Sequence, residues 1–252
     1  DYRYKSLDKW KEIYFKEAEI YKRNDYELCL ESVYGIPEFN QKEIKKSRII
    51  ACPGCYPTSA LIPLIPFALQ GIIESEGIII DSKSGISGGG RTAKEHLLYS
   101  EAGEGISAYG LLTHRHTSEI QQILSHVSGL NIQLIFTPHL IPIVRGMFST
   151  IYGRLKDPGL TADDCKILLD NFYRNYENVK VLPVGIYPSS KWVKNSNDIY
   201  ISVNVDNRSG KIILLSTIDN LLKGQAGQAV QNLNLISGLK HNEGLDLTTF
   251  YP

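Results

Sequence analysis

The succession of predicted elements indicates a mixed α and β protein, in which an α/β part leads into an α+β part. Two observations support this fold class. Helical periodicity alternates with short strand-like runs early in the chain, and alternating, hairpin-like strands dominate its middle. A chain of 252 residues, of which 42% are hydrophobic, is long enough for one large domain or two smaller ones.

The first part of the chain predicts two helices and a strand. Apolar residues recur at helical spacing and predict a helix near residues 8–20, and a β-type run at 47–51 ends in a Pro-Gly turn. A second helix should begin at Tyr56 or Pro57 and run towards residue 70, since proline suits the first helical turn. Two further prolines inside this helix should bend it.

The middle of the chain predicts a buried strand at 78–83, followed directly by a glycine-rich loop at 84–91. Apolar residues at helical spacing then indicate a helix, for which Thr117 is the expected N-cap. Strands are expected near 131–136 and 146–155.

The last part of the chain predicts two helices around a hairpin. Thr161, followed by two aspartates, should open a helix that runs to about Tyr176. Apolar and polar residues alternate over 199–205, and a turn at 206–210 then leads into a second strand at 211–217, which together predict a hairpin. A final helix is expected over 219–236, and its small residues predict that another element packs closely against it.

The bulk composition excludes several classes of protein. Lys+Arg and Asp+Glu both number 27, which argues against a nucleic-acid partner. No run of 18 or more apolar residues predicts a membrane span, and the polar start does not resemble a secretory signal. Four cysteines in a chain of this size do not predict a disulfide scaffold, so we expect a reducing cytoplasm. Because the first residue is Asp1, we expect a truncated product or part of a longer protein.

Cys55 lies where a strand, a tight turn and a helix start are expected to meet, and this setting favours a reactive thiol. Helix N-terminal N–H groups and a cationic histidine can lower the pKa of a thiol, and a drop of about two units would make the thiolate the major form. Gly54 should let the backbone turn. The alternative is a structural cysteine, which is how we interpret Cys29 and Cys165.

Cys52 and Cys55 also form a C-x-x-C pair, a pattern that is weakly informative by itself. It leaves open a thioredoxin-like redox pair, or half of a metal site completed by His114 and His116. A third hypothesis is a reversible disulfide that switches the thiol off under oxidation. We expect Cys52 to be indifferent, and we predict no metal.

Two further segments can carry chemistry. His114 can serve a nucleophilic thiol as acid and base, and Arg115 can pair with a substrate carboxylate or phosphate. A solvated basic corner at a helix start is the alternative. The glycine-rich loop can bring backbone N–H groups to an anionic or nicotinamide-bearing ligand. It matches neither the dinucleotide fingerprint nor the P-loop.

Several segments, in the same order and with similar gaps, resemble the N-acetyl-gamma-glutamyl-phosphate reductase family. They are residues 54–58, 83–91, 114–120, 138–147, 219–231 and 234–235. The resemblance covers essentially the whole chain. It departs from the family at Cys52, where an Asn or another small polar residue is usual, and at Ser118, where a Pro is usual.

The resemblance implies a fold and its division. Residues 1–54 would be the C-terminal part of a Rossmann domain, and residues 55–218 a mixed-sheet catalytic and dimerisation domain of the glyceraldehyde-3-phosphate-dehydrogenase-like type. Residues 219–252 would carry a helix that returns to the Rossmann domain. The N-terminal βαβ unit that holds the pyrophosphate would be missing, so we expect this polypeptide alone to bind NADPH poorly.

The resemblance also implies an activity, namely NADPH-dependent reduction of N-acetyl-gamma-glutamyl phosphate to N-acetylglutamate semialdehyde in arginine biosynthesis. Cys55 would be the nucleophile that forms a thioester, and His114 its acid/base partner. Substrate contacts would come from Arg115 and Arg91. The residues implied to approach NADP(H) are Ser84, Gly85, Ser87, Gly88, Gly89, Lys223, Gly224 and Gln225.

The implied partners are a small acyl phosphate, inorganic phosphate and further copies of the chain in a homo-oligomer, a dimer or a tetramer. Two rival functions remain. One is the related aminoadipyl-phosphate reductase of lysine biosynthesis, and the other is an inactive module retained for assembly.

Overall fold

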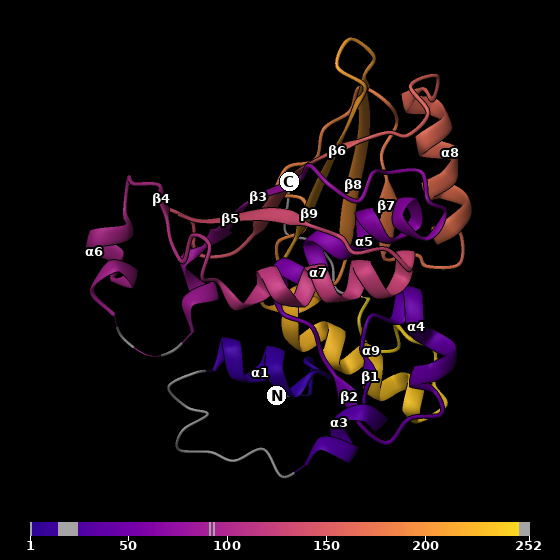
Figure 1. The fold of residues 1–252 in the computed structure, drawn as a ribbon. Helices are drawn as coiled ribbons and strands as arrows, with labels where there is room; N and C mark the ends of the chain where they lie inside the picture. The colour runs from indigo at the N-terminus through magenta and orange to yellow at the C-terminus, as the bar shows by residue number, and fades with distance from the viewer. Residues whose placement is uncertain (1, 15–24, 91, 93, 247–252) are drawn as a thin grey trace.

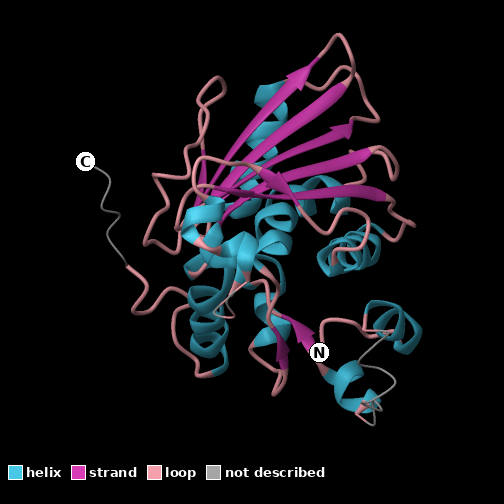
Figure 2. Cartoon of the chain, turned by 90° about the vertical axis from the view of Figure 1, so that its left-hand side faces the viewer, coloured by secondary structure: helices cyan, strands magenta, loops and turns pink. Residues whose placement is uncertain are grey.

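The computed structural model describes residues 2–14, 25–90, 92 and 94–246. A large sheet occupies one end of the molecule and a small parallel sheet the other, with helices between them (Figures 1 and 2). In the small sheet β1 (Val33–Tyr34) pairs in parallel with β2 (Ile50–Ala51). The helices around it are α1 (Leu7–Ile13), α3 (Tyr26–Glu31), α4 (Pro37–Ile44) and, from the other end of the chain, α9 (Gly227–Ile236).

The large sheet has seven strands in the order β4-β5-β3-β6-β9-β8-β7. β3 pairs with β5 and β7 with β8 in parallel, and the other neighbours are antiparallel, so the sheet is mixed as expected. The strands are β3 (Ile78–Gly85), β4 (Ser107–Ala108), β5 (Leu134–Ile141), β6 (Met147–Arg154), β7 (Val179–Val181), β8 (Ile199–Asp206) and β9 (Lys211–Ile218).

Helices cover one face of this sheet. α5 (Cys55–Leu69) packs on β6 and β9, α7 (Arg115–Ser128) on β5, and α8 (Ala162–Tyr173) on β8. α5 is buried from Tyr56 to Ala68, which explains why it is apolar all round. It lies between the large sheet and the N-terminal part of the molecule (Figure 1).

Four buried serines fix α5 on the sheet. Ser82, Ser149 and Ser216 occupy matching positions on β3, β6 and β9. The hydroxyl of Ser59 on α5 lies 2.5 Å from that of Ser149 and 3.0 Å from that of Ser216, and Ser82 lies 2.7 Å from Ser149. Because the side chains are small and hydrogen-bonded, the helix can approach the strands closely at a point one turn after Cys55.

The structure confirms most of the predicted elements and corrects several ends. The capping box of Thr161 with Asp164 opens α8, and the hairpin of β8 and β9 is present. Thr117 is not the N-cap of α7: His114 caps it, because its Nδ1 accepts the backbone N–H of His116. α1 ends at Ile13, and the rest of the expected helix at 8–20 lies largely outside the described residues.

Two findings complete the fold. The expected helix over 219–236 begins as one π-helical stretch, Leu222–Ala226, and becomes α-helical only at α9. Its small residues are closely packed, since a Cβ on Gly227 would lie 2.1 Å from Oδ1 of Asn197. Within the ranges that the structure describes, no helix is both long enough and apolar enough to cross a membrane.

Candidate active site

Cys55 is the first residue of α5, and Gly54 is the N-cap. β2 ends four residues earlier, so the predicted junction of strand, turn and helix is present. The backbone N–H groups of Tyr56 and Cys55 favour the thiolate, but the loss of water around the sulfur outweighs them. Burial raises the pKa of Cys55 to about 11, the opposite of the direction that we expected.

The need for glycine at position 54 comes from its neighbour and not from the turn. Gly54 has φ −73° and ψ 167°, a conformation open to any residue, so the backbone turn itself does not require glycine. A Cβ at this position would lie 2.3 Å from Nε2 of His116. The ring of His116 therefore rests directly on the backbone that precedes the thiol.

The two histidines of the His-Arg-His segment meet the residues on either side of Cys55. The ring centroid of Tyr56 lies 5.8 Å from that of His114 and 5.9 Å from that of His116. The centroids of the two imidazole rings are 4.7 Å apart. The fold thus brings together the two segments that the sequence singled out. Burial, with Arg115 adding to it, lowers the pKa of His114 to about 4, and burial also lowers the pKa of His116 well below its ordinary value. Both rings are neutral at pH 7.

Glu119 is a site residue that sequence reasoning did not select. Its carboxylate is fully buried and accepts hydrogen bonds from the backbone N–H of Gly54 at 3.1 Å and from the hydroxyl of Tyr34 at 2.7 Å. Arg3 forms an ion pair with it at 2.9 Å. Burial raises its pKa, although Arg3 opposes the shift. The sequence feature that could have identified Glu119 is an acidic residue on the buried face of the predicted helix, next to the apolar Ile120.

The glycine-rich loop is held by the chain itself. Ser84 and Gly85 end β3, and Ile86–Gly89 form a short 3₁₀ helix. The backbone N–H groups of residues 85, 86 and 87 donate to the carbonyl oxygens of residues 146, 143 and 144, in that order. A Cβ on Gly85 would lie 2.7 Å from the carbonyl oxygen of Val144. These N–H groups are therefore not available to a ligand. The backbone at 88–90 is exposed, and a flat ligand can approach it there.

The other predicted binding residues differ in accessibility. Arg115 is exposed in the first turn of α7, beside His114. Arg91 lies outside the described residues. Gln225 is exposed, whereas Lys223 is fully buried and its ammonium group forms an ion pair with Glu38 at 2.6 Å. The Lys223 side chain is thus occupied inside the protein.

Both cysteines of the C-x-x-C pair lie in the part of the chain that the structure describes, and no disulfide joins them. All four cysteines are free thiols. Nδ2 of Asn232 donates to the sulfur of Cys52 at 3.6 Å. Among the described side chains, no group of three or more His, Cys, Asp or Glu could hold a metal ion, so the zinc alternative is not supported.

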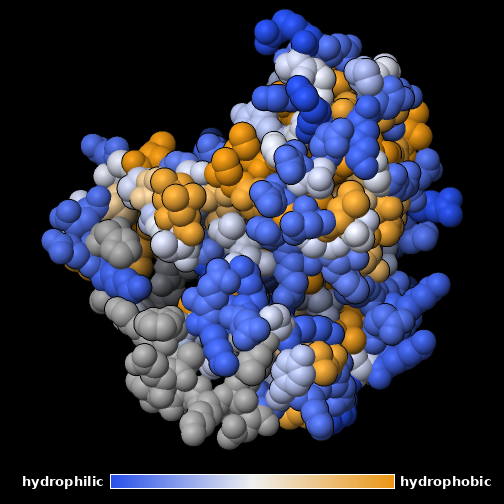
Figure 3. All heavy atoms as spheres, viewed as in Figure 1, coloured by the Kyte–Doolittle hydropathy of each residue, from blue (hydrophilic) through white to orange (hydrophobic). Residues whose placement is uncertain are grey.

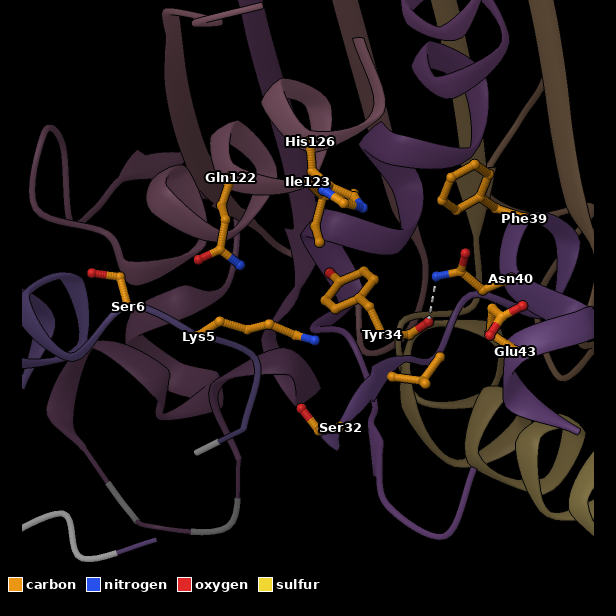
Figure 4. A pocket seen from close by; sticks show the side chains of 11 residues that line it. Lys5, Ser6, Ser32, Tyr34, Phe39, Asn40, Glu43, Gln122, Ile123 and His126 are labelled. Carbon is orange, nitrogen blue, oxygen red and sulfur yellow. Dashed lines mark hydrogen bonds between the residues drawn. The ribbon is translucent and has the colours of Figure 1, made fainter. Parts of the chain in front are cut away.

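A cavity of about 480 Å³ lies between β1, α4 and α7 (Figure 4). Tyr34, Phe39 and Ile123 form part of its wall, and Lys5 and His126 add polar groups. None of the predicted catalytic residues lines it. The cavity is separate from the thiol, although Tyr34 links its wall to the Glu119 carboxylate.

The fold matches that of known semialdehyde dehydrogenases. The family model described as semialdehyde dehydrogenase, dimerisation domain, matches residues 55–220. Two solved structures share the fold at low sequence identity. Aspartate semialdehyde dehydrogenase II from Vibrio cholerae has a TM-score of 0.66, at 16% identity over 83% of this chain and 69% of its own. The enzyme from Francisella tularensis has a TM-score of 0.64, at 14% identity over 82% and 71%. The chain is therefore of the semialdehyde dehydrogenase class.

Curated relatives define the family more closely. N-acetyl-gamma-glutamyl-phosphate reductase of Prochlorococcus marinus strain MIT 9515 is 70% identical over all 252 residues, which span 72% of that protein. The reductase of strain NATL1A is 63% identical over the same residues, which span 70% of it. The chain belongs to the N-acetyl-gamma-glutamyl-phosphate reductase family.

Proposed function

We propose that this chain forms the thioester in the reduction of N-acetyl-gamma-glutamyl phosphate to N-acetylglutamate semialdehyde, a step of arginine biosynthesis. The observation that carries the proposal is the position of Cys55, at the start of a buried helix and flanked by two residues that contact the His-Arg-His segment. The names of the curated relatives favour this substrate over the aminoadipyl phosphate of the lysine pathway.

The proposed chemistry starts from a neutral pair. Because burial raises the pKa of Cys55 and lowers that of His114, the resting site holds a thiol and an uncharged imidazole. His114 takes the thiol proton as the sulfur attacks the acyl carbonyl, and phosphate leaves. The N–H groups at the start of α5 can then hold the carbonyl oxygen as it gains charge. Glu119 fixes the Gly54 backbone and so holds Cys55 in place.

NADPH, when bound, supplies the hydride that converts the thioester to the aldehyde. The exposed glycines 88–90 and Gln225 would meet it, because these residues are open to solvent. Ser87 is anchored beside these glycines by Asn220, whose Nδ2 donates to its hydroxyl at 2.9 Å. Arg115 is the proposed contact for a substrate carboxylate or phosphate.

Homo-oligomer formation is part of the proposal. The sheet face opposite α5 carries a row of four apolar residues on neighbouring strands, namely Ile135, Ile79, Tyr152 and Ile213. Of these, Ile79 and Ile135 are 37% and 52% exposed. Figure 3 shows further apolar surface over β4, where Ile106 is 70% exposed. The match to a dimerisation domain supports oligomer formation, and we place the second copy on this open sheet face because of its exposed apolar row.

Two remaining assignments belong to the same proposal. We place the division of the chain after residues 54 and 218, which the family match at 55–220 supports. We place the protein in the cytoplasm, which the four free thiols support.

Acylation of Cys55 tests the function without a cofactor. The chain is incubated with N-acetyl-gamma-glutamyl phosphate in the absence of NADPH, and the peptides are analysed by mass spectrometry. We expect one acyl adduct on Cys55 and none in the Cys55→Ala variant, while Cys52→Ser keeps the adduct. An adduct on another residue, or none at all, would refute the assignment. Phosphate-dependent reduction of NADP+ with N-acetylglutamate semialdehyde then tests the complete reaction.

A further inference from the structure

Lys223 and Glu38 form a fully buried ion pair close to the proposed nucleophile. Nζ of Lys223 donates to Oε1 of Glu38 at 2.6 Å and to Oε1 of Gln231 at 2.7 Å. Asn178 donates to the same Glu38 oxygen at 2.7 Å. Neither charged side chain of the pair has any exposed surface. Burial disfavours the Glu38 carboxylate, but Lys223 together with the hydrogen bonds from Asn178 and the backbone outweighs this and holds the pKa of Glu38 below its ordinary value.

The residue that follows Lys223 touches Cys55. A Cβ on Gly224 would lie 2.7 Å from the Cβ of Cys55 and 3.3 Å from its Cα. Gly224 lies in the π-helical stretch, where its N–H donates to the carbonyl of Asp219 at 2.9 Å. π-Helical turns inside helices occur frequently at functional sites. A shift of this stretch would therefore move the backbone against which the cysteine rests.

Stability alone does not account for such a pair. Taking two charges out of water costs free energy, and apolar residues of similar volume commonly stabilise a core as well or better. The pair does supply a fixed distance and direction between two elements. Glu38 is in the first turn of α4, next to the small sheet, and Lys223 is in the π-helical stretch.

We propose that the Glu38–Lys223 ion pair is a positioning device that holds the π-helical stretch against Cys55 and so sets the position of its sulfur. Its effect on turnover rests on the function proposed above, whereas its effect on the thiol does not. Neither residue needs to touch the substrate, because both act through Gly224.

The test compares single and double substitutions. Glu38→Gln and Lys223→Met each leave one buried group without its partner, so both should lower the Tm. The double variant Glu38→Leu/Lys223→Met removes both charges and should return the Tm to within about 4 °C of the parent. Leu169→Ala, in the core of α8, is the matched control, because it should lower the Tm without reaching the π-helical stretch.

The informative measurement is the rate at which iodoacetamide alkylates Cys55, followed by peptide mass spectrometry. We expect the double variant to differ from the parent by about threefold or more, with faster reaction as Gly224 moves away. Its kcat should fall about tenfold or more while KM changes little. Leu169→Ala should keep the parent's alkylation rate.

A double variant that folds and alkylates at the rate of the parent would overturn the proposal, since the pair would then have no effect on the position of the sulfur. If the double variant does not fold, Lys223→Arg decides: it keeps the charge but changes the reach, and we expect faster alkylation at a nearly unchanged Tm. An unchanged rate in that variant would equally overturn the proposal. Alkylation needs no substrate, so a failure of the proposed function would be seen separately in the acylation experiment.

Discussion

The charge state of Cys55 gives the sharpest prediction. Burial raises its pKa from 9.0 to about 11. Two units correspond to about 2.7 kcal/mol against the thiolate, and the thiolate fraction at pH 7 falls from about 1% to about 0.01%. The alkylation rate of Cys55 should therefore rise about tenfold for each pH unit between pH 7 and 10, without a plateau near neutrality.

Iodoacetamide labelling at a series of pH values, with peptide mass spectrometry to resolve Cys55 from the other cysteines, measures this profile. His114→Asn is the control. Because the His114 imidazole is neutral in the resting site, its removal should leave the profile nearly unchanged. A plateau between pH 5 and 8 that disappears in His114→Asn would refute the reasoning, since it would reveal a thiolate paired with an imidazolium ion.

Three further predictions follow from the same contacts. Gly54→Ala should lower the Tm by several degrees and slow acylation, because its Cβ would collide with the His116 ring. Gly105→Ala should do neither, because its Cβ would only come to 3.9 Å from the carbonyl oxygen of Gly103. Calorimetry should show stability falling as the pH drops from 6.5 to 4, because His114 binds a proton in the unfolded chain before it does so in the folded one; a flat Tm over this range would contradict it. Leu215→Arg, on the open sheet face, should yield monomers in light scattering after size exclusion, and an unchanged oligomer would place the interface elsewhere.

The elements that local patterns define were predictable from the sequence. The hairpin of β8 and β9 follows from alternation and a turn, and the start of α8 from Thr161 and its acidic neighbours. The segments around Cys55 and His114 were selected because the residue types suit thiol chemistry. Short elements such as β1 and α4 were missed, because a strand of two residues or a kinked helix leaves no clear period.

The electrostatics of the site could not be predicted in this way. The sign of the Cys55 pKa shift depends on how tightly residues distant in the sequence pack around the sulfur, and the sequence shows only the favourable helix terminus. The same applies to Lys223, whose position in a family motif suggested a ligand contact. Its partner Glu38 lies 185 residues earlier in the chain, and only the fold brings the two together.

Nε2 of Gln228 donates a hydrogen bond to the hydroxyl of Thr58 at 2.8 Å, and this bond joins residues that are 170 positions apart in the chain. The site can therefore form only when these two distant segments meet during folding. The bond lies beside the place where Gly224 meets Cys55, so the thiol becomes shielded only when the last helix docks on the start of α5. Local structure can form early, but such distant segments meet late. The time at which Cys55 becomes protected from a thiol reagent during refolding would therefore report when the last helix docks.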